Sequence, residues 1–280
     1  MSSINNYIFN CTEVSLRKFT AVTTFNQKGL DTYARRFINS FAINMPIQLM
    51  VYAEDCTPEP TNNVEWFDLA KESPELVAFK TKWANEPKAN GDVTSDPVRS
   101  KRRDSGKGFK WDAVRFSHKI YSILAAAKQT DADVLIWMDA DTFCHSPMPL
   151  EFLDKFIPED KDICFLGRKD KFSECGFYSM NLRSNAVQVF LKRFQWMYDD
   201  AENGIFQQDE WHDSFIFDIV RKHTVLNELD WSSNLITGEG HPFINTDLGK
   251  YLDHLKGKRK EYGKSLTSDL KIKREESYWQ

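Results

Sequence analysis

Two aspartates separated by one small residue, Asp139-Ala-Asp141, directly follow an apolar run of strand character at 134–138. Alternate residues of a strand point to opposite faces, but the chain can turn where the strand ends, so both carboxylates can converge on one point. Two carboxylates aimed at one point repel each other unless a cation lies between them. Carboxylate oxygens suit Mg²⁺ or Mn²⁺, which typically bridge protein carboxylates to substrate phosphates. The pattern predicts a divalent-metal site, with a solvated acidic turn as the plain alternative.

A second candidate group lies near the C-terminus, in His254-Leu-Lys-Gly257-Lys-Arg-Lys260. Imidazole is a good ligand for metals of the Mn²⁺ class. Gly257 lets the backbone approach a ligand closely, and the basic residues around it could neutralise a diphosphate. The alternative is a solvated basic tail with an incidental histidine.

Together the two motifs resemble those of GT-A-fold glycosyltransferases. Asp139-Ala-Asp141 is similar to their D-x-D motif, which holds a divalent metal, usually Mn²⁺, against the diphosphate of a nucleotide sugar. His254-x-x-Gly257-x-x-Lys260 is similar to the H-x-x-G-x-x-K motif of the glycogenin-like members. The resemblance implies that Asp139, Asp141 and His254 are the metal ligands, with Mn²⁺ or Mg²⁺ as cofactor. It also implies that Gly257 and Lys260 contact the diphosphate and that Asp139 can bind the ribose.

A third segment, Trp211-His212-Asp213-Ser214, follows Asn203-Gly-Ile205. It resembles the W-H-D-E-S segment of the blood-group-type transferases, which implies that Trp211 and His212 contact the sugar and the acceptor. The E of that motif is missing, so Glu210 and Asp213 are the candidate catalytic carboxylates. A retaining mechanism is favoured, with inversion as the alternative. Independently of the resemblance, Asp213 is predicted to be the N-cap of a helix that follows it.

Further donor contacts are expected from a helix that precedes the metal motif. Arg115 and Lys119 are spaced i, i+4 and share a helix face. The resemblance implies that they reach the donor phosphates or sugar, whereas a solvated charged face is the alternative. By the same resemblance, Thr23 and Phe25 at the end of the first strand would face the nucleobase.

Two loops complete the expected site. The loop at 174–177 would bring Glu174 and Gly176 to the sugar and acceptor. The basic run at 101–110 could be a lid over the diphosphate, a nucleic-acid contact or a solvated loop.

These residues must be positioned by an α/β scaffold. A strand at 19–25, a helix at 30–43 and a strand at 47–52 predict a parallel βαβ unit. The remaining predicted elements are helices at 66–83 (broken at 73–74), 109–128, 150–156, 185–198 and 213–222, and strands at 133–138 and 162–167. After residue 223 the chain is expected to be irregular.

The fold class that follows is α/β: a single GT-A (Rossmann-like) domain over 1–280, with a mostly parallel central sheet flanked by helices. Residues 19–142 would form the nucleotide-binding half. Residues 143–265 would form the acceptor- and sugar-binding half with the metal-ligand tail.

The overall composition argues against several classes of protein, namely those with a general attraction to nucleic acid, a zinc site, a disulfide framework or a membrane span. The 280 residues carry a net charge of −4, which gives no global attraction to nucleic acid. The five cysteines form no C-x-x-C pair, so neither a zinc site nor a disulfide framework is indicated. With no signal peptide and no apolar run of bilayer length, we expect a cytoplasmic protein without membrane contact, in the host cytoplasm if it is phage-encoded.

The predicted function is metal-dependent transfer of a sugar from a nucleoside diphosphate sugar, with UDP the expected nucleotide, to a hydroxyl acceptor. The acceptor would be a glycan or a hydroxymethylated base of phage DNA. One alternative is a sugar-phosphate nucleotidyltransferase, although Thr23-Thr-Phe-Asn-Gln-Lys-Gly29 is a poor match to its Gly-rich loop. The other is a non-catalytic protein that binds a nucleotide sugar or a carbohydrate.

Overall fold

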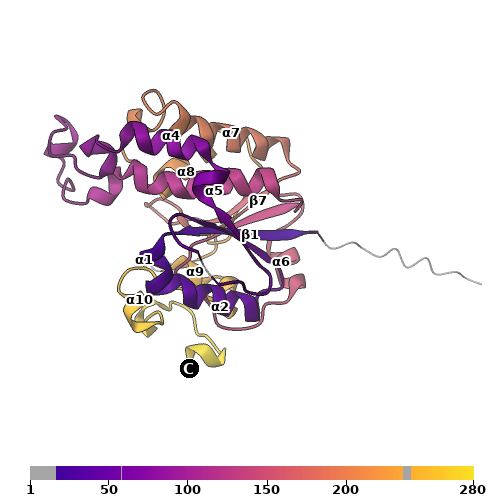
Figure 1. Cartoon of the computed structure of the whole chain (residues 1–280). Coiled ribbons are helices and arrows are strands. Elements are labelled where there is room, and N and C mark those ends of the chain that lie inside the picture. The colour runs from indigo at the N-terminus through magenta and orange to yellow at the C-terminus, as the bar shows by residue number, and fades with distance from the viewer. Residues whose placement is uncertain (1–16, 58, 236–240) are drawn as a thin grey trace, which may run out of the picture.

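The computed structural model describes residues 17–57, 59–235 and 241–280, in which a seven-stranded sheet lies between two layers of helices (Figure 1). The strand order is β3-β2-β1-β4-β7-β6-β8. Every neighbouring pair is parallel except the two that involve β7. The predicted fold class, a mostly parallel α/β sheet flanked by helices, is confirmed.

The strands of the large sheet are β1 (Phe19–Phe25), β2 (Gln48–Ala53), β3 (Val64–Asp68), β4 (Val134–Met138), β6 (Ile163–Leu166), β7 (Glu174–Asn181) and β8 (Glu228–Asp230). A second, two-stranded sheet pairs β5 (Thr142–Cys144) with β9 (Leu252–His254). The α-helices of the described residues are α1 (Gln27–Gly29), α2 (Arg35–Asn44), α3 (Leu69–Glu72), α4 (Pro74–Trp83), α5 (Ala113–Gln129), α6 (Leu150–Phe156), α7 (Asn185–Asp199), α8 (Asp213–Lys222), α9 (Pro242–Asn245) and α10 (Arg259–Tyr262).

The central strand β4 is apolar throughout because both of its faces are covered. Leu135 and Trp137 pack on one face, in the core formed with α4, α5, α7 and α8. The even-numbered residues of β4 pack on the other face, with α2, α6 and α9. Since side chains alternate along a strand, Asp139 continues the series of Trp137 and points toward α5.

The prediction of one broken helix over 66–83 is wrong in its first part. Val64–Asp68 forms β3, a half-exposed edge strand that is parallel to β2, and the helices begin only at Leu69. The predicted break is confirmed, because Ser73 separates α3 from α4. The five residues of β3 are too few for their alternation to stand out beside the helical period that follows.

The prediction of a loop at 174–177 is also wrong, because these residues begin the buried strand β7. This strand runs antiparallel between β4 and β6, so its first residues lie at the sheet edge where β4 ends. The segment after residue 223 is more regular than expected, since it contains β8, α9, β9 and α10.

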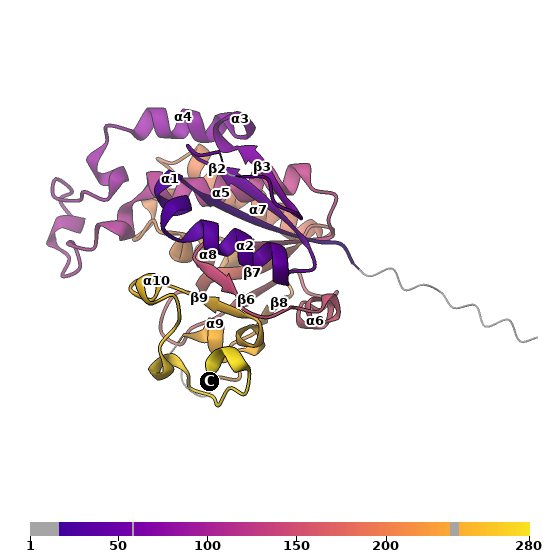
Figure 2. The ribbon, with the colours of Figure 1, turned by 60° about the horizontal axis from the view of Figure 1, so that its bottom comes forward.

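Between α4 and α5 the chain makes a long excursion that projects beyond the N-terminal end of α5 (Figure 2). Its regular structure consists of three short 3₁₀ turns, Pro87–Asn90, Arg99–Lys101 and Gly108–Trp111. Within the described ranges, no helix is long and apolar enough to cross a membrane.

Candidate active site

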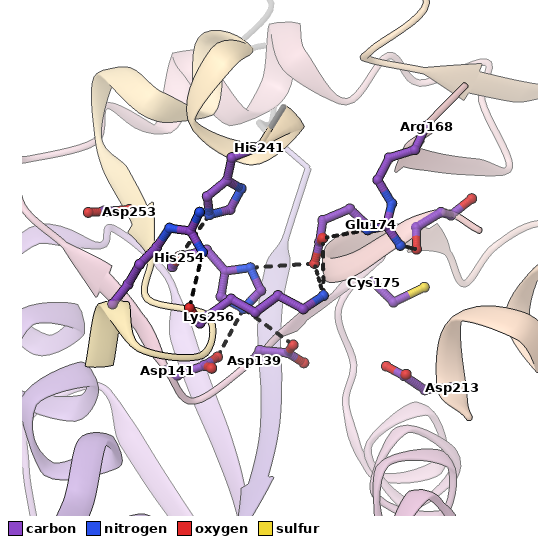
Figure 3. A network of polar contacts seen from close by, with 12 residues as sticks. Asp139, Asp141, Arg168, Glu174, Cys175, Asp213, His241, Asp253, His254 and Lys256 are labelled. Atoms are coloured by element: carbon purple, nitrogen blue, oxygen red, sulfur yellow. Dashed lines mark hydrogen bonds and ion pairs between the residues drawn. The ribbon is translucent and has the colours of Figure 1, made fainter. Parts of the chain in front are cut away.

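Asp139, Asp141 and His254 come together at the carboxyl end of β4 (Figure 3). Nε2 of His254 lies 3.0 Å from Oδ1 of Asp141 and 3.5 Å from Oδ2 of Asp139. One candidate ligand atom from each residue lies within 4.8 Å of the other two. Residues 113 positions apart in the chain therefore converge as a two-carboxylate, one-imidazole cluster.

The two-stranded sheet holds His254 in place. Thr142, the residue after Asp141, pairs with His254 across β5 and β9, and the backbone N–H of Leu255 donates to the carbonyl of Asp141 at 2.9 Å. A Cβ atom on Gly176 would lie 2.5 Å from Cε1 of His254, so only glycine leaves room for the imidazole ring. The first residues of β7 thus form the wall behind the histidine.

Basic groups neutralise this cluster. Nζ of Lys260 lies 2.9 Å from Oδ2 of Asp141, while His254 contacts the other oxygen. Burial opposes ionisation of Asp141, but His254 and Lys260 outweigh it and hold the pKa of the Asp141 carboxyl well below its usual range. Burial also disfavours the imidazolium form of His254, yet the adjacent Asp141 carboxylate dominates and raises its pKa.

A third carboxylate lies behind the histidine. Glu174 is buried, and its Oε1 lies 3.5 Å from Nδ1 of His254 (Figure 3). Lys256 and Arg168 approach its Oε2 at 3.3 and 3.6 Å. Burial alone would raise the pKa of Glu174, but Lys256, His254 and Arg168 lower it to about 2. Glu174 is therefore an ionised group that can orient the imidazole from its second nitrogen.

Lys119 is the buried cation of the site. Its Nζ lies 2.7 Å from Oδ2 of Asp213, 3.2 Å from Oδ1 of Asp139 and 2.7 Å from the carbonyl oxygen of Cys175. Burial disfavours the charged form, but the two carboxylates dominate and raise the pKa of Lys119 well above its usual value. Arg115, one turn earlier on α5, is exposed. The ammonium group of Lys119 thus connects the metal cluster to the start of α8.

The prediction that Asp213 caps α8 is wrong. The N-cap is His212, whose Nδ1 accepts a hydrogen bond from the backbone N–H of Phe215 at 3.3 Å. Asp213 is the first helical residue, and its carboxylate turns to Lys119 instead. Burial opposes its ionisation, but Lys119 lowers the pKa of Asp213 to about 2.

Glu210 is also buried and fully engaged. Its Oε1 accepts hydrogen bonds from Lys110 at 2.7 Å and from Arg102 at 3.2 Å, and its Oε2 lies 2.9 Å from Nε2 of His212. Lys110 and Arg102 belong to the basic run at 101–110. This run is therefore attached to the segment that begins α8 by charged contacts.

The cluster opens into a cavity of about 1050 Å³. Ten of the residues predicted from the sequence line it: Arg115, Asp139, Asp141, Glu174, Glu210, His212, Asp213, His254, Gly257 and Lys260. Lys119 and Gly176 lie directly behind this lining, where they contact Asp139 and His254.

The three other predicted site residues lie neither in this lining nor directly behind it. Thr23 and Phe25 are buried in the sheet, and Phe25 packs edge-on against Trp66 in the core. Trp211 is buried against Phe206, and its indole N–H donates to the carbonyl of Gln208 at 3.0 Å. On β1 it is Thr24 that reaches the surface, because alternate side chains of the strand point to opposite faces.

Several residues of the cavity wall are not among those predicted from the sequence: Arg168, Lys171, Phe172 and Lys222. Arg168 follows β6 by two positions, at the edge where the parallel strands end. Its place after a predicted strand was a usable signal, since ligands bind beyond the carboxyl ends of parallel strands. Lys222, at the end of a helix, carried no such signal.

Comparison with known proteins identifies the family that part of the chain resembles. Residues 104–226 match the model of glycosyl transferase family 2, a range that runs from the basic excursion past the D-x-D motif to just beyond the end of α8. The resemblance to glycosyltransferases is thereby confirmed, and the match supports a glycosyl transfer function. No curated protein matches the chain in sequence.

Solved structures with a similar backbone include mouse xyloside xylosyltransferase 1, with 12% identity, 74% of this chain and 82% of that chain covered, and a TM-score of 0.43. Another is a glycosyltransferase involved in the glycosylation of the major capsid of PBCV-1, with 11% identity, 88% and 99% coverage and a TM-score of 0.44. A third is a galactosyltransferase in complex with donor and acceptor sugar analogs, with 10% identity, 75% and 72% coverage and a TM-score of 0.38.

Proposed function

We propose that the protein transfers a sugar from a nucleoside diphosphate sugar, with UDP the expected nucleotide, to a hydroxyl acceptor with the help of a divalent metal. The observation that carries the proposal is the convergence of Asp139, Asp141 and His254 inside a cavity lined by basic side chains. The match to glycosyl transferase family 2 over 104–226 supports the same reaction class.

The three candidate ligands, Asp139, Asp141 and His254, fit a divalent metal ion. Two carboxylates and one imidazole suit Mn²⁺, and the resemblance to GT-A-fold glycosyltransferases implies Mn²⁺ or Mg²⁺. The ionised Glu174 near the second nitrogen of His254 is the kind of outer partner that fixes a ligating histidine. When bound, the ion would supply electrostatic stabilisation to the departing diphosphate.

The basic residues of the cavity would bind and neutralise the diphosphate. Its negative charge grows as the bond to the anomeric carbon breaks, so fixed cations are most useful at that point. Arg115, Lys256 and Lys260 line the cavity with ammonium or guanidinium groups. Lys119 would act differently, because it is buried between Asp139 and Asp213 and holds both carboxylates in position.

Asp213 and Glu210 are our candidates for the carboxylates on the sugar side. Asp213 lines the cavity and is held ionised by Lys119, so it can accept a hydrogen bond from a sugar hydroxyl. Glu210 is engaged by Lys110, Arg102 and His212, an arrangement that favours a positioning role over proton transfer. We favour retention of the anomeric configuration, and NMR of the product against the donor distinguishes it from inversion.

The test is product formation from a panel of nucleoside diphosphate sugars with Mn²⁺ present. Release of the nucleoside diphosphate, lost with excess chelator and in Asp141→Asn, is the expected result. Formation of a nucleoside triphosphate and a sugar 1-phosphate from the same nucleoside diphosphate sugars, once pyrophosphate is added, would identify a nucleotidyltransferase. Donor binding without any product would identify a binding protein, and full activity in chelator would refute the metal requirement.

A further inference from the structure

A second cavity of about 820 Å³ adjoins the proposed donor cavity. Three residues, Arg168, Lys171 and Lys222, line both cavities. The second cavity lies beyond the end of β6, between the C-terminal part of α8 and the segment after β8. The two cavities therefore share part of their wall.

The wall of this cavity is strongly basic. Among the described residues, six cationic side chains line it against two carboxylates: Arg168, Lys169, Lys171, Arg221, Lys222 and Lys271 against Asp218 and Asp230. Such an excess in a concave site concentrates the positive potential and favours an anionic occupant.

The two carboxylates are already satisfied by the protein. Oδ1 of Asp218 accepts from the hydroxyl of Ser173 at 2.6 Å and from Arg221 at 3.1 Å, and its Oδ2 accepts from the backbone N–H of Ser173 at 2.9 Å. Oδ1 of Asp230 accepts from the backbone N–H groups of Gly167 and Ser232, each at 2.8 Å. These acids therefore fix the backbone of the cavity, and neither forms an ion pair with a lysine of its wall among the described residues.

The exposed lysines remain uncompensated. Among the described residues, Lys169, Lys171 and Lys222 form no ion pair within 4.0 Å, although all three are exposed around one cavity. Like charges gathered in this way repel one another, and an anion among them would relieve the repulsion. Arg168 differs, because it is held by Glu174 and by the carbonyl oxygens of Phe172 and Ser173.

We propose that the second cavity binds the acceptor and that this acceptor is an acidic saccharide, one that carries a carboxylate or a phosphate group. The inference rests on the proposed function, since it names the substrate class of the same site. The basic residues surround a pocket and the chain as a whole has a net charge of −4, which favours a compact anionic sugar over a nucleic-acid duplex.

The test uses matched acceptors with the donor identified in the donor panel. Neutral saccharides, uronic-acid saccharides, sugar phosphates and hydroxymethylcytosine duplex DNA are compared by kcat/KM. We expect acidic saccharides to exceed their neutral counterparts by about ten-fold or more, which corresponds to one charge-assisted hydrogen bond. The comparison of uronic acids with sugar phosphates identifies the anionic group.

Charge-reversal variants then test whether the preference for acidic acceptors arises in the second cavity. Lys169 and Lys271 line only the second cavity, so Lys169→Glu/Lys271→Glu should raise the KM for the acidic acceptor by about ten-fold and leave donor hydrolysis unchanged. The control, Lys128→Glu/Lys192→Glu, makes the same change in net charge outside both cavities.

Equal use of neutral saccharides, transfer to DNA alone, or an acidic preference that survives Lys169→Glu/Lys271→Glu would each overturn the inference. These outcomes leave the proposed function standing as long as donor hydrolysis releases the nucleoside diphosphate. Absence of any nucleoside diphosphate would instead refute the proposed function itself.

Discussion

Gly176→Ala tests the geometry of the candidate metal site more directly than removal of a ligand does. The new Cβ would lie 2.5 Å from Cε1 and 2.7 Å from Nδ1 of His254. Carbon atoms prefer separations of about 3.5–4.0 Å, so the ring must move by roughly 1 Å. The ring has little room to do so, because His254 is only 1% exposed and packs against Phe243 and His241.

Two effects are expected from this displacement. Overpacking a buried site typically costs about 1–3 kcal/mol, so the free energy of unfolding should fall by that amount in the presence of chelator. Metal sites tolerate ligand shifts of only about 0.2 Å, and displaced or misoriented ligands weaken metal binding by about 10–100-fold. The apparent Kd for Mn²⁺, read from the metal dependence of nucleoside diphosphate release, should rise within that range.

The controls separate steric displacement from a general effect of alanine. Gly106→Ala adds the same methyl group where nothing lies within 4 Å, so it should change neither stability nor Mn²⁺ affinity. In a His254→Ala background, Gly176→Ala should lose most of its cost in unfolding free energy, because the clashing ring is absent. A Gly176→Ala protein with wild-type stability and wild-type Mn²⁺ affinity would refute the reasoning.

Three further outcomes are expected. Asp141→Asn should abolish Mn²⁺-dependent release of nucleoside diphosphate while circular dichroism shows a folded protein; measurable turnover at saturating Mn²⁺ would exclude Asp141 as a ligand. Lys119→Met should lower the free energy of unfolding, measured in urea, by about 3–5 kcal/mol, because two carboxylates lose their buried partner. The double variant Lys119→Met/Asp213→Asn should recover part of this lost free energy, because one of the two unpaired charges is removed. Burial lowers the pKa of His145 from 6.5 to about 4, so the unfolded state binds more protons between these values, and stability should fall as the pH drops from 6.5 to about 4. The loss due to His145 is at most about 3.4 kcal/mol, and His145→Phe, which keeps an aromatic ring at this position, should remove that part of the pH dependence. Identical pH profiles of the two proteins would contradict this expectation.

Much of the scaffold could be predicted because its periodicities are clear. The bounds of β1, α6 and α8 match the predicted ranges 19–25, 150–156 and 213–222. Asp139 and Asp141 follow a buried strand at the carboxyl edge of the sheet, as expected. A strand that is apolar on both faces must lie in the interior of a covered sheet, so two acids that directly follow it must lie at the edge of that sheet.

The antiparallel strand β7 could not be recognised in the same way. Glu174–Asn181 contains glycine and small polar residues, and its first residue is a buried acid that only the tertiary structure neutralises. Gly176 weakens the sequence pattern of a strand. Only glycine fits at this position, however, because a Cβ atom would clash with the ring of His254. The feature that obscured the strand in the sequence is thus the one that makes room for the candidate ligand.

Lys119 illustrates a different limit. Its i, i+4 spacing from Arg115 predicts a shared helix face, but Lys119 is buried whereas Arg115 is exposed. Helix α5 packs against β4, so a side chain one turn further along reaches the end of the strand and meets the carboxylates of Asp139 and Asp213. A buried lysine in this position cannot follow a mobile substrate without leaving two carboxylates unpaired. Arg115 is exposed and can move without leaving a buried carboxylate unpaired. It is therefore the better candidate on this helix for binding a diphosphate that must arrive and leave with every turnover.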